Sequence, residues 1–190
     1  RLAPADYWRY TLIANRPETK DTNFTWTIFL EKVNSDLNDT LGNFIHRALT
    51  FIDKYYDGRV PSPKNMEQLD KQVLETIKES YDKIENALKH FQLQAAVRKV
   101  IELSREGNKY LNEKKPWKTV KEDQQTTANT LYVAAQIVKA LSVLLEPFVP
   151  FSAEKLRDML NISPTARWND AIKPLTAGHN IKKPKPLFHK

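Results

Sequence analysis

The 190-residue chain is long enough to bury a sizeable hydrophobic core, and its length is typical of a single domain with or without extensions. It has no cysteine and no apolar run close to the roughly 20 residues that span a bilayer, which argues against disulfides, thiolate metal sites and a membrane partner and favours a cytoplasmic location. The formal net charge of +7 favours polyanionic partners, although residues of both signs are interspersed along the chain.

The chain begins with a predicted short helix, followed by a long one. Pro4 is suited to a first helical turn, and apolar residues at helical spacing extend the segment to about Ala14. Its aromatic residues are expected in the core rather than on a stacking platform: Tyr7, Trp8 and Tyr10. A long helix is then expected from Thr25, a suitable N-cap, to Tyr56, and Asp57-Gly58 provides a natural end.

Further amphipathic helices are predicted in the rest of the chain. Apolar residues at helical spacing indicate them at about residues 66–88, 93–111 and 125–146, and the last of these is expected to be the most buried. A short helix is expected with Ser152 as its N-cap, and the proline- and lysine-rich end beyond it lacks helical periodicity. Together with the presence of only four glycines, these patterns predict an all-α helix bundle with an irregular, extended C-terminal tail.

Asn43 and Arg47 lie one helical turn apart on the predicted long helix. At 100° per residue both side chains should project away from the apolar stripe, with His46 to one side. The planar guanidinium donates and the amide both donates and accepts, so the pair could hydrogen-bond the edges of neighbouring unpaired bases. Asn and Arg at this spacing are also common on ordinary exposed helices, and the spacing alone favours a solvent-exposed face without a binding role.

Trp117 follows Pro116 in a segment that is predicted to be a loop, NEKKPWKTVK. The lysines around the ring are Lys114, Lys115, Lys118 and Lys121. A flat ring amid positive charge is typical of a platform on which unpaired bases stack. Because tryptophan is usually well buried, the alternative is that the ring folds inward over the end of the bundle, and the residue type alone favours this alternative.

The residues with catalytic or metal-binding chemistry form no recognisable site. The four histidines are scattered, no HExxH pair exists, and no nucleophile lies in a characteristic elbow. The carboxylates follow predicted helix surfaces, and no glycine-rich phosphate loop is present. The sequence therefore predicts no catalytic residue and no metal site in this chain.

Three stretches that cover nearly the whole chain resemble the C-terminal anticodon-binding helix bundle of methionyl-tRNA synthetases, which are class I aminoacyl-tRNA synthetases. They are APADYWRYTLIANRPETKDTNFTWTIFLEKVNSDLNDTLGNFIHRALTFIDKYYDG, GNKYLNEKKPW and RWNDAIKPLTAGHNIKKPKPLF. The resemblance implies that Trp117 stacks on bases of the CAU anticodon while Asn43 and Arg47 contact base edges. The partner would be methionine tRNA, initiator and elongator, bound through its anticodon loop. Residues expected to support this site are His46, Asn108, Tyr110, Lys114, Lys115 and Lys118.

The resemblance also implies what lies outside the chain. In the family a Rossmann-like catalytic domain with HIGH-like and KMSKS-like motifs activates methionine with ATP and Mg, and neither motif occurs here. We therefore expect no cofactor in this segment. The segment alone should be inactive, whereas the full-length enzyme would be an ATP-dependent methionine-tRNA ligase. The expected partner in the same chain is that catalytic domain, and a natural stand-alone module is the alternative.

The expected domain organisation follows the family. Residues 1–24 would be a connector helix and loop after the catalytic domain, residues 25–162 the anticodon-binding bundle, and residues 163–190 an extended tail that packs back on the junction. The sequence is also compatible with two other functions: the anticodon domain of a leucyl, valyl, isoleucyl or cysteinyl enzyme, and a helical protein-interaction scaffold. The joint occurrence of the Asn43/Arg47 pair and Pro116-Trp117 favours methionine.

Overall fold

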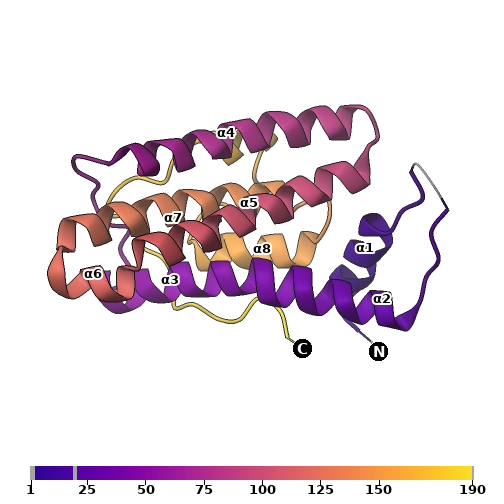
Figure 1. Ribbon diagram of the computed structural model, residues 1–190, viewed down its shortest axis with the longest axis horizontal. Coiled ribbons are helices and arrows are strands. Elements are labelled where there is room, and N and C mark those ends of the chain that lie inside the picture. Colours follow the sequence, from indigo (N-terminus) through magenta and orange to yellow (C-terminus); the bar gives the residue numbers. More distant parts are fainter. Residues whose placement is uncertain (1–2, 19–20, 190) are drawn as a thin grey trace.

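The helix that the sequence predicts to be most buried forms the centre of the molecule. In the computed structural model, which describes residues 3–18 and 21–189, α7 (Gln124–Leu144) is buried along most of its length. It packs against α3 (Asn43–Tyr56), α4 (Gln68–Lys89) and α5 (Leu93–Lys114), as Figure 1 shows. Its alanine, valine and leucine side chains fill the space between these neighbours, so the prediction of a central apolar helix is confirmed.

The remaining elements lie at the ends and along the sides of this core. They are α1 (Ala5–Ala14), α2 (Trp26–Glu31), η1 (Lys32–Gly42), α6 (Pro116–Glu122), α8 (Pro150–Met159) and η2 (Trp168–Ile172). In Figure 1, α6 lies at one end of the elongated molecule and α1 and α2 lie at the other. The described residues form no strand, so the predicted all-α class is confirmed. None of the helices within the described ranges is long and apolar enough to cross a membrane.

The predicted long helix is continuous in direction but not uniform. Thr25 caps α2 by accepting a hydrogen bond of 3.1 Å from the backbone N–H of Ile28. The backbone then passes through η1, a π-helical segment, before α3 resumes the tighter α-helical turn. Within η1, Asn38 and Thr40 each donate a side-chain hydrogen bond to the carbonyl five residues earlier, which favours the wider turn. Hydrophobic periodicity does not report such local polar competition.

The start of α8 differs from the prediction. The helix begins at Pro150, and Ser152 lies in its first turn rather than at the N-cap. The capping acceptor comes from α1: the buried Asp6 carboxylate accepts from the backbone N–H of Ser152 at 2.6 Å and from the Ser152 hydroxyl at 2.6 Å. A carboxylate at a helix N-terminus satisfies free N–H groups and is favoured by the helix dipole. Asp6 therefore links α1 to the start of α8, 146 residues later in the chain.

The C-terminal tail packs across the bundle. It hydrogen-bonds to the turn after α3, where the backbone N–H of Val60 donates to the carbonyl of His179 at 2.9 Å. Further on, the backbone N–H of His189 donates to the Tyr7 hydroxyl on α1 at 2.8 Å. Most of the tail is extended, as expected, but η2 adds a short 3-10 helix that the sequence pattern did not indicate. The core placement predicted for Tyr7 and Tyr10 is confirmed, and Trp8 is half-buried.

Candidate nucleic-acid interface

Trp117 lies on a short helix and not in the loop that the sequence predicts. Helix α5 ends at Lys114, and Lys115 adopts a left-handed backbone conformation with φ 48° and ψ 58°. Pro116 then starts α6, because its fixed φ suits the first helical position and its missing N–H leaves no donor unsatisfied. This tight junction holds the half-buried Trp117 ring beside α3.

Arg47 on α3 meets Trp117 and two asparagines of α5. Its guanidinium carbon lies 5.4 Å from the centroid of the Trp117 ring, within range of a cation–π contact. Its two terminal nitrogens donate to the side-chain oxygens of Asn108 at 3.3 Å and Asn112 at 2.9 Å. Burial lowers the pKa of Arg47, but a guanidinium stays protonated at neutral pH. Since it carries five N–H donors, donors remain for a ligand.

Asn108 is itself held in one orientation. Its amide nitrogen donates to the backbone carbonyls of Thr40 at 2.9 Å and Ser104 at 3.3 Å, which leaves its oxygen directed to Arg47. The adjacent Gly107 permits this close approach of α5 to α3: a Cβ added there would lie 2.4 Å from the Phe44 ring. The supporting role expected for Asn108 therefore has a geometric basis in positioning Arg47.

Asn43 and His46 lie on the exposed part of α3. With Gly42, Asn38 and residues 186–188 of the tail, they line a hollow of about 200 Å³. The Asn43 amide makes no hydrogen bond to any other residue that the structure describes, so its donor and acceptor are both free to meet a ligand. Asn43 and Arg47 thus share a helix face, as predicted, but only Arg47 is tied to a second helix.

Tyr110 and Lys114, expected from the sequence to support an RNA site, lie inside the bundle. The Tyr110 hydroxyl donates to Asp70 at 2.7 Å, and burial together with this carboxylate raises the pKa of Tyr110. The Lys114 ammonium lies 3.1 Å from both Asp70 and Glu67. These contacts join α5 to α4 and leave neither side chain free to touch RNA. Lys115 and Lys118 are exposed beside Trp117.

Sequence reasoning missed Asn112 and the aromatic residues that continue the α3 face. Asn112 stands one turn after Asn108, a spacing that could have singled it out. Phe51 and Tyr55 continue the four-residue interval of Asn43 and Arg47, and the Phe51 ring lies 6.1 Å from Trp117. This four-residue interval is the sequence signal that could have indicated them.

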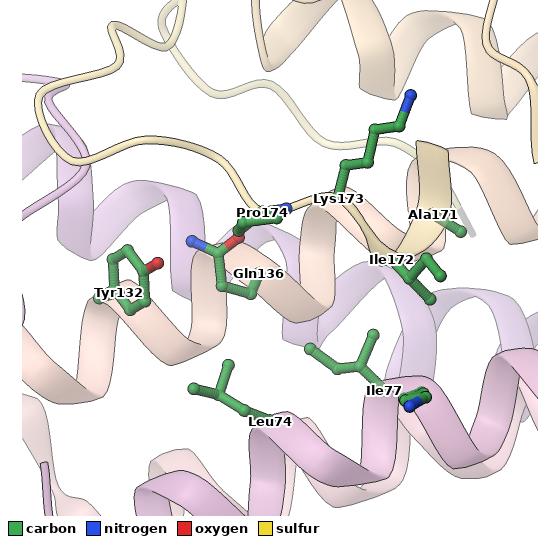
Figure 2. Close-up of a pocket in the computed structure, with 9 residues that line it drawn as sticks. Leu74, Ile77, Tyr132, Gln136, Ala171, Ile172, Lys173 and Pro174 are labelled. Atoms are coloured by element: carbon green, nitrogen blue, oxygen red, sulfur yellow. The ribbon is translucent and has the colours of Figure 1, made fainter. Parts of the chain in front are cut away.

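A separate groove of about 490 Å³ lies between α4, α7 and the tail. Figure 2 shows Leu74 and Ile77 of α4 facing Tyr132 and Gln136 of α7, with residues 171–174 closing a third side. Gln136 fixes the tail there through two hydrogen bonds to the backbone of Leu175. The groove shares no residue with the Arg47 and Trp117 cluster. In the described part of the chain, no group of three or more His, Cys, Asp or Glu residues could hold a metal ion.

The chain is similar to parts of known proteins. A family model described as "Anticodon binding domain of methionyl tRNA ligase" matches residues 60–190, and one described as "tRNA synthetases class I (M)" matches residues 1–49. The methionine–tRNA ligase of Pyrococcus horikoshii is 42% identical over 187 residues, which cover 98% of this chain and 26% of the relative. That of Metallosphaera sedula is 41% identical over 190 residues, which cover 100% of this chain and 34% of the relative.

The chain is also similar to parts of solved methionyl-tRNA synthetase structures. Mycobacterium tuberculosis methionyl-tRNA synthetase in its apo form superimposes with a TM-score of 0.91 at 28% identity, covering 97% of this chain and 38% of that chain. Its complex with methionyl-adenylate gives a TM-score of 0.87 at 30% identity, covering 97% of this chain and 37% of that chain. The chain thus spans between about a quarter and two fifths of the length of the proteins named here.

Proposed function

Because the chain belongs to the family of anticodon-binding domains of methionyl-tRNA ligases, we propose that it binds the CAU anticodon of methionine tRNA, initiator and elongator. The family resemblance inferred from the sequence is confirmed. The observation that carries the proposal is the convergence of Arg47 and Trp117, 70 residues apart in sequence, with a guanidinium-to-ring distance of 5.4 Å. A ring, a partly free guanidinium and a nearby free amide are the groups that recognise unpaired bases.

Each group has a distinct part in the proposed recognition. The exposed part of the half-buried Trp117 ring accepts a stacked base, and stacking tolerates any base because each has a π-face. Arg47 uses its remaining N–H donors, and Asn43 its free amide, to hydrogen-bond base edges; these contacts carry the discrimination between anticodons. A wrong base would cover one of these groups without pairing with it, and the unpaired polar group is what penalises that base.

Positive charge around the ring attracts the phosphate backbone. Lys115 and Lys118 are exposed on either side of Trp117, whereas the Lys114 ammonium is neutralised by Asp70 and Glu67. His46 can add a hydrogen bond next to Asn43. Neutralisation of phosphates by lysine makes binding stronger at low salt.

The proposal is tested by replacing the platform. We expect Trp117→Ala to weaken binding of a CAU anticodon stem-loop by roughly 1–3 kcal/mol, the usual contribution of one stacked base. The matched control is Trp26→Ala, which removes an exposed tryptophan from α2 without touching the cluster and should leave affinity unchanged. Equal affinity of the Trp117→Ala variant and the intact chain, with helicity preserved, would refute the platform role.

We further propose that the chain serves a catalytic portion of a longer protein that attaches methionine with ATP and Mg. The chain spans 26% of the length of the Pyrococcus horikoshii methionine–tRNA ligase, and it contains neither the HIGH-like nor the KMSKS-like motif. Support comes from exposed apolar side chains near the N-terminus, within the segment that matches the class I synthetase family model. These side chains are Leu12, Phe24, Trp26 and Leu30.

Such a cluster of exposed apolar side chains is typical of an interaction surface. The rings of Trp8, Phe24 and Trp26 contact one another at centroid distances of 5.6 to 6.0 Å. If the catalytic portion covers them, backbone amides of α2 will exchange hydrogen more slowly in a longer chain that includes it than in this chain. Equal exchange rates would show that the surface is not covered.

A further inference from the structure

The candidate interface does not stop at Trp117, because an aromatic row continues along α3. Phe51 lies 6.1 Å from Trp117, and Tyr55 stacks on Phe51 with ring centroids 5.7 Å apart and an interplanar angle of 10°. Cations stand at both ends of the row: Arg47 lies 5.4 Å from the Trp117 centroid, and the Lys54 ammonium lies 5.4 Å from that of Tyr55. The half-buried rings form one connected surface on α3 and α6.

A second hollow, of about 290 Å³, opens at the far end of this row. Two rings and two aliphatic side chains form its apolar part: Tyr55, Tyr56, Val120 and Ala128. Two glutamine amides form its polar part: Gln124 and Gln125. Gln125 donates to Asn129 at 3.0 Å, whereas the exposed Gln124 amide makes no side-chain hydrogen bond to any residue the structure describes. Aromatic walls with a free amide at the rim suit the face and the polar edge of a nucleobase.

The charges around this hollow favour a neutral base over a phosphate. Glu122 and Asp123 lie next to Gln124 in the chain, and a phosphate inside the hollow would meet their negative charge. The Asp123 carboxylate is engaged as the cap of α7, accepting from the backbone N–H and the hydroxyl of Thr126, and these hydrogen bonds lower its pKa. The exposed lysines lie outside the hollow, where they can follow a phosphate backbone: Lys54, Lys118 and Lys121.

The distance between the two sites fits one RNA loop. Eight residues separate Arg47 from Tyr55, which corresponds to about 12 Å along a helix axis. We propose that the hollow at Tyr55 and Gln124 binds one further unpaired base of the same RNA, flanking the three bases read at Asn43, Arg47 and Trp117. This inference rests on the proposed function and extends it beyond the anticodon triplet.

The experiment uses abasic substitutions at each loop position outside CAU in an anticodon stem-loop, titrated against the 190-residue chain. One abasic position should weaken binding by roughly fivefold or more, because fivefold corresponds to the smallest usual contribution of one stacked base to affinity. Tyr55→Leu, which keeps an apolar side chain against Phe51, should weaken binding of the intact loop by a similar factor and abolish the effect of that abasic position. Gln124→Ala changes an exposed side chain at the same hollow, and it should also weaken binding of the intact loop.

Tyr132→Leu is the matched control, since this half-buried tyrosine lines the separate groove of Figure 2 and should leave affinity unchanged. Unchanged binding by both Tyr55→Leu and Gln124→Ala, with no sensitive abasic position, overturns the inference. If Trp117→Ala still weakens binding in that case, the anticodon site stands and only its extension fails. If neither Trp117→Ala nor Tyr55→Leu alters binding, the proposed function fails as well.

Discussion

At the scale of single residues, the placement of Arg47 depends on Asn108. This amide accepts from Arg47 and is anchored to the Thr40 and Ser104 carbonyls, so it links α3, η1 and α5. Asn108→Ala should weaken stem-loop binding by about 1 kcal/mol and lower stability by a similar amount, because the guanidinium loses a fixed acceptor. Asn112→Ala removes only the exposed hydrogen bond from Arg47 to Asn112, and it should lower stability less than Asn108→Ala. Equal stability of Asn108→Ala and the intact chain in urea unfolding would contradict this positioning role.

Gly107 allows α5 to approach α3 beside the site. An added Cβ would lie 2.4 to 2.8 Å from atoms of the buried Phe44 ring, a distance that forces one helix to shift. Gly107→Ala should therefore destabilise the chain by about 1–3 kcal/mol, the usual cost of overpacking a core. In a Phe44→Leu background the smaller side chain relieves the overlap, and the added cost of Gly107→Ala should shrink. A cost that is the same in both backgrounds would show that the contact with Phe44 is not its cause.

At the scale of elements, apolar periodicity predicted the main helices and the central position of α7. The spacing of apolar residues shows whether a helix buries one face or all of its faces. It could not place α6, since that helix depends on Lys115 adopting a left-handed conformation before Pro116. The π-helical segment and the cap of α8 by Asp6 also depend on polar contacts invisible to periodicity. For the site, helix geometry placed Asn43 and Arg47 on one face, and the family resemblance supplied their role and the expectation for Asn108. The contact between Arg47 and Asn108, 61 residues apart in sequence, required the fold.

The contact between α4 and α5 depends on a buried carboxylate. Asp70 is fully buried, accepts from Tyr110, and pairs with Lys114 at 3.1 Å. Asp70→Asn should destabilise the chain by about 3 kcal/mol, because the buried ammonium loses its buried partner and keeps only the exposed Glu67 carboxylate. The matched control is Glu67→Gln, which removes the other carboxylate near Lys114; as that carboxylate is 62% exposed, the cost should be at most about 1 kcal/mol. Equal losses of unfolding free energy for the two variants would contradict this assignment.

At the scale of the whole molecule, two buried tyrosines determine how stability responds to alkali. Burial and the nearby carboxylates raise the pKa of Tyr10, which bonds to Asp36, and of Tyr110, which bonds to Asp70. Below pH 10 both tyrosines are protonated in the folded and unfolded chain, so their stabilisation is fully present. Above about pH 10 the unfolded chain releases these protons while the folded chain keeps them, and stability falls.

The decline should amount to about 1.4 kcal/mol per pH unit for each tyrosine. Tyr110→Phe removes one titrating group, so its unfolding free energy should fall less steeply than that of the intact chain above pH 10. Urea unfolding at several pH values between 9 and 11 measures how steeply the unfolding free energy of each protein falls with pH. Lysines titrate equally in both proteins, so they do not contribute to the difference. Parallel curves would show that the Tyr110 proton is not linked to folding.

The position of the candidate interface also belongs to the scale of the whole molecule. Trp117 lies at the α6 end, opposite the end that carries α1, α2 and their exposed rings (Figure 1). The two surfaces can therefore be occupied at once, one by the RNA and one by the catalytic portion that we propose as its partners. This separation fits a domain that selects a tRNA at a distance from the chemistry.

We propose that Asn43, Arg47 and Trp117 together recognise the CAU triplet. The most direct test of this proposal is a titration of the chain with a CAU anticodon stem-loop and with the single-base variants of that triplet, repeated with Arg47→Ala and Asn43→Ala. We expect the intact chain to bind CAU most tightly, by about tenfold or more over each variant, because one lost hydrogen-bonded contact costs roughly 1.4 kcal/mol. Each substitution should reduce the preference at a particular base. Equal affinity for all these loops, or a preference that persists unchanged in both variants, would contradict the proposal.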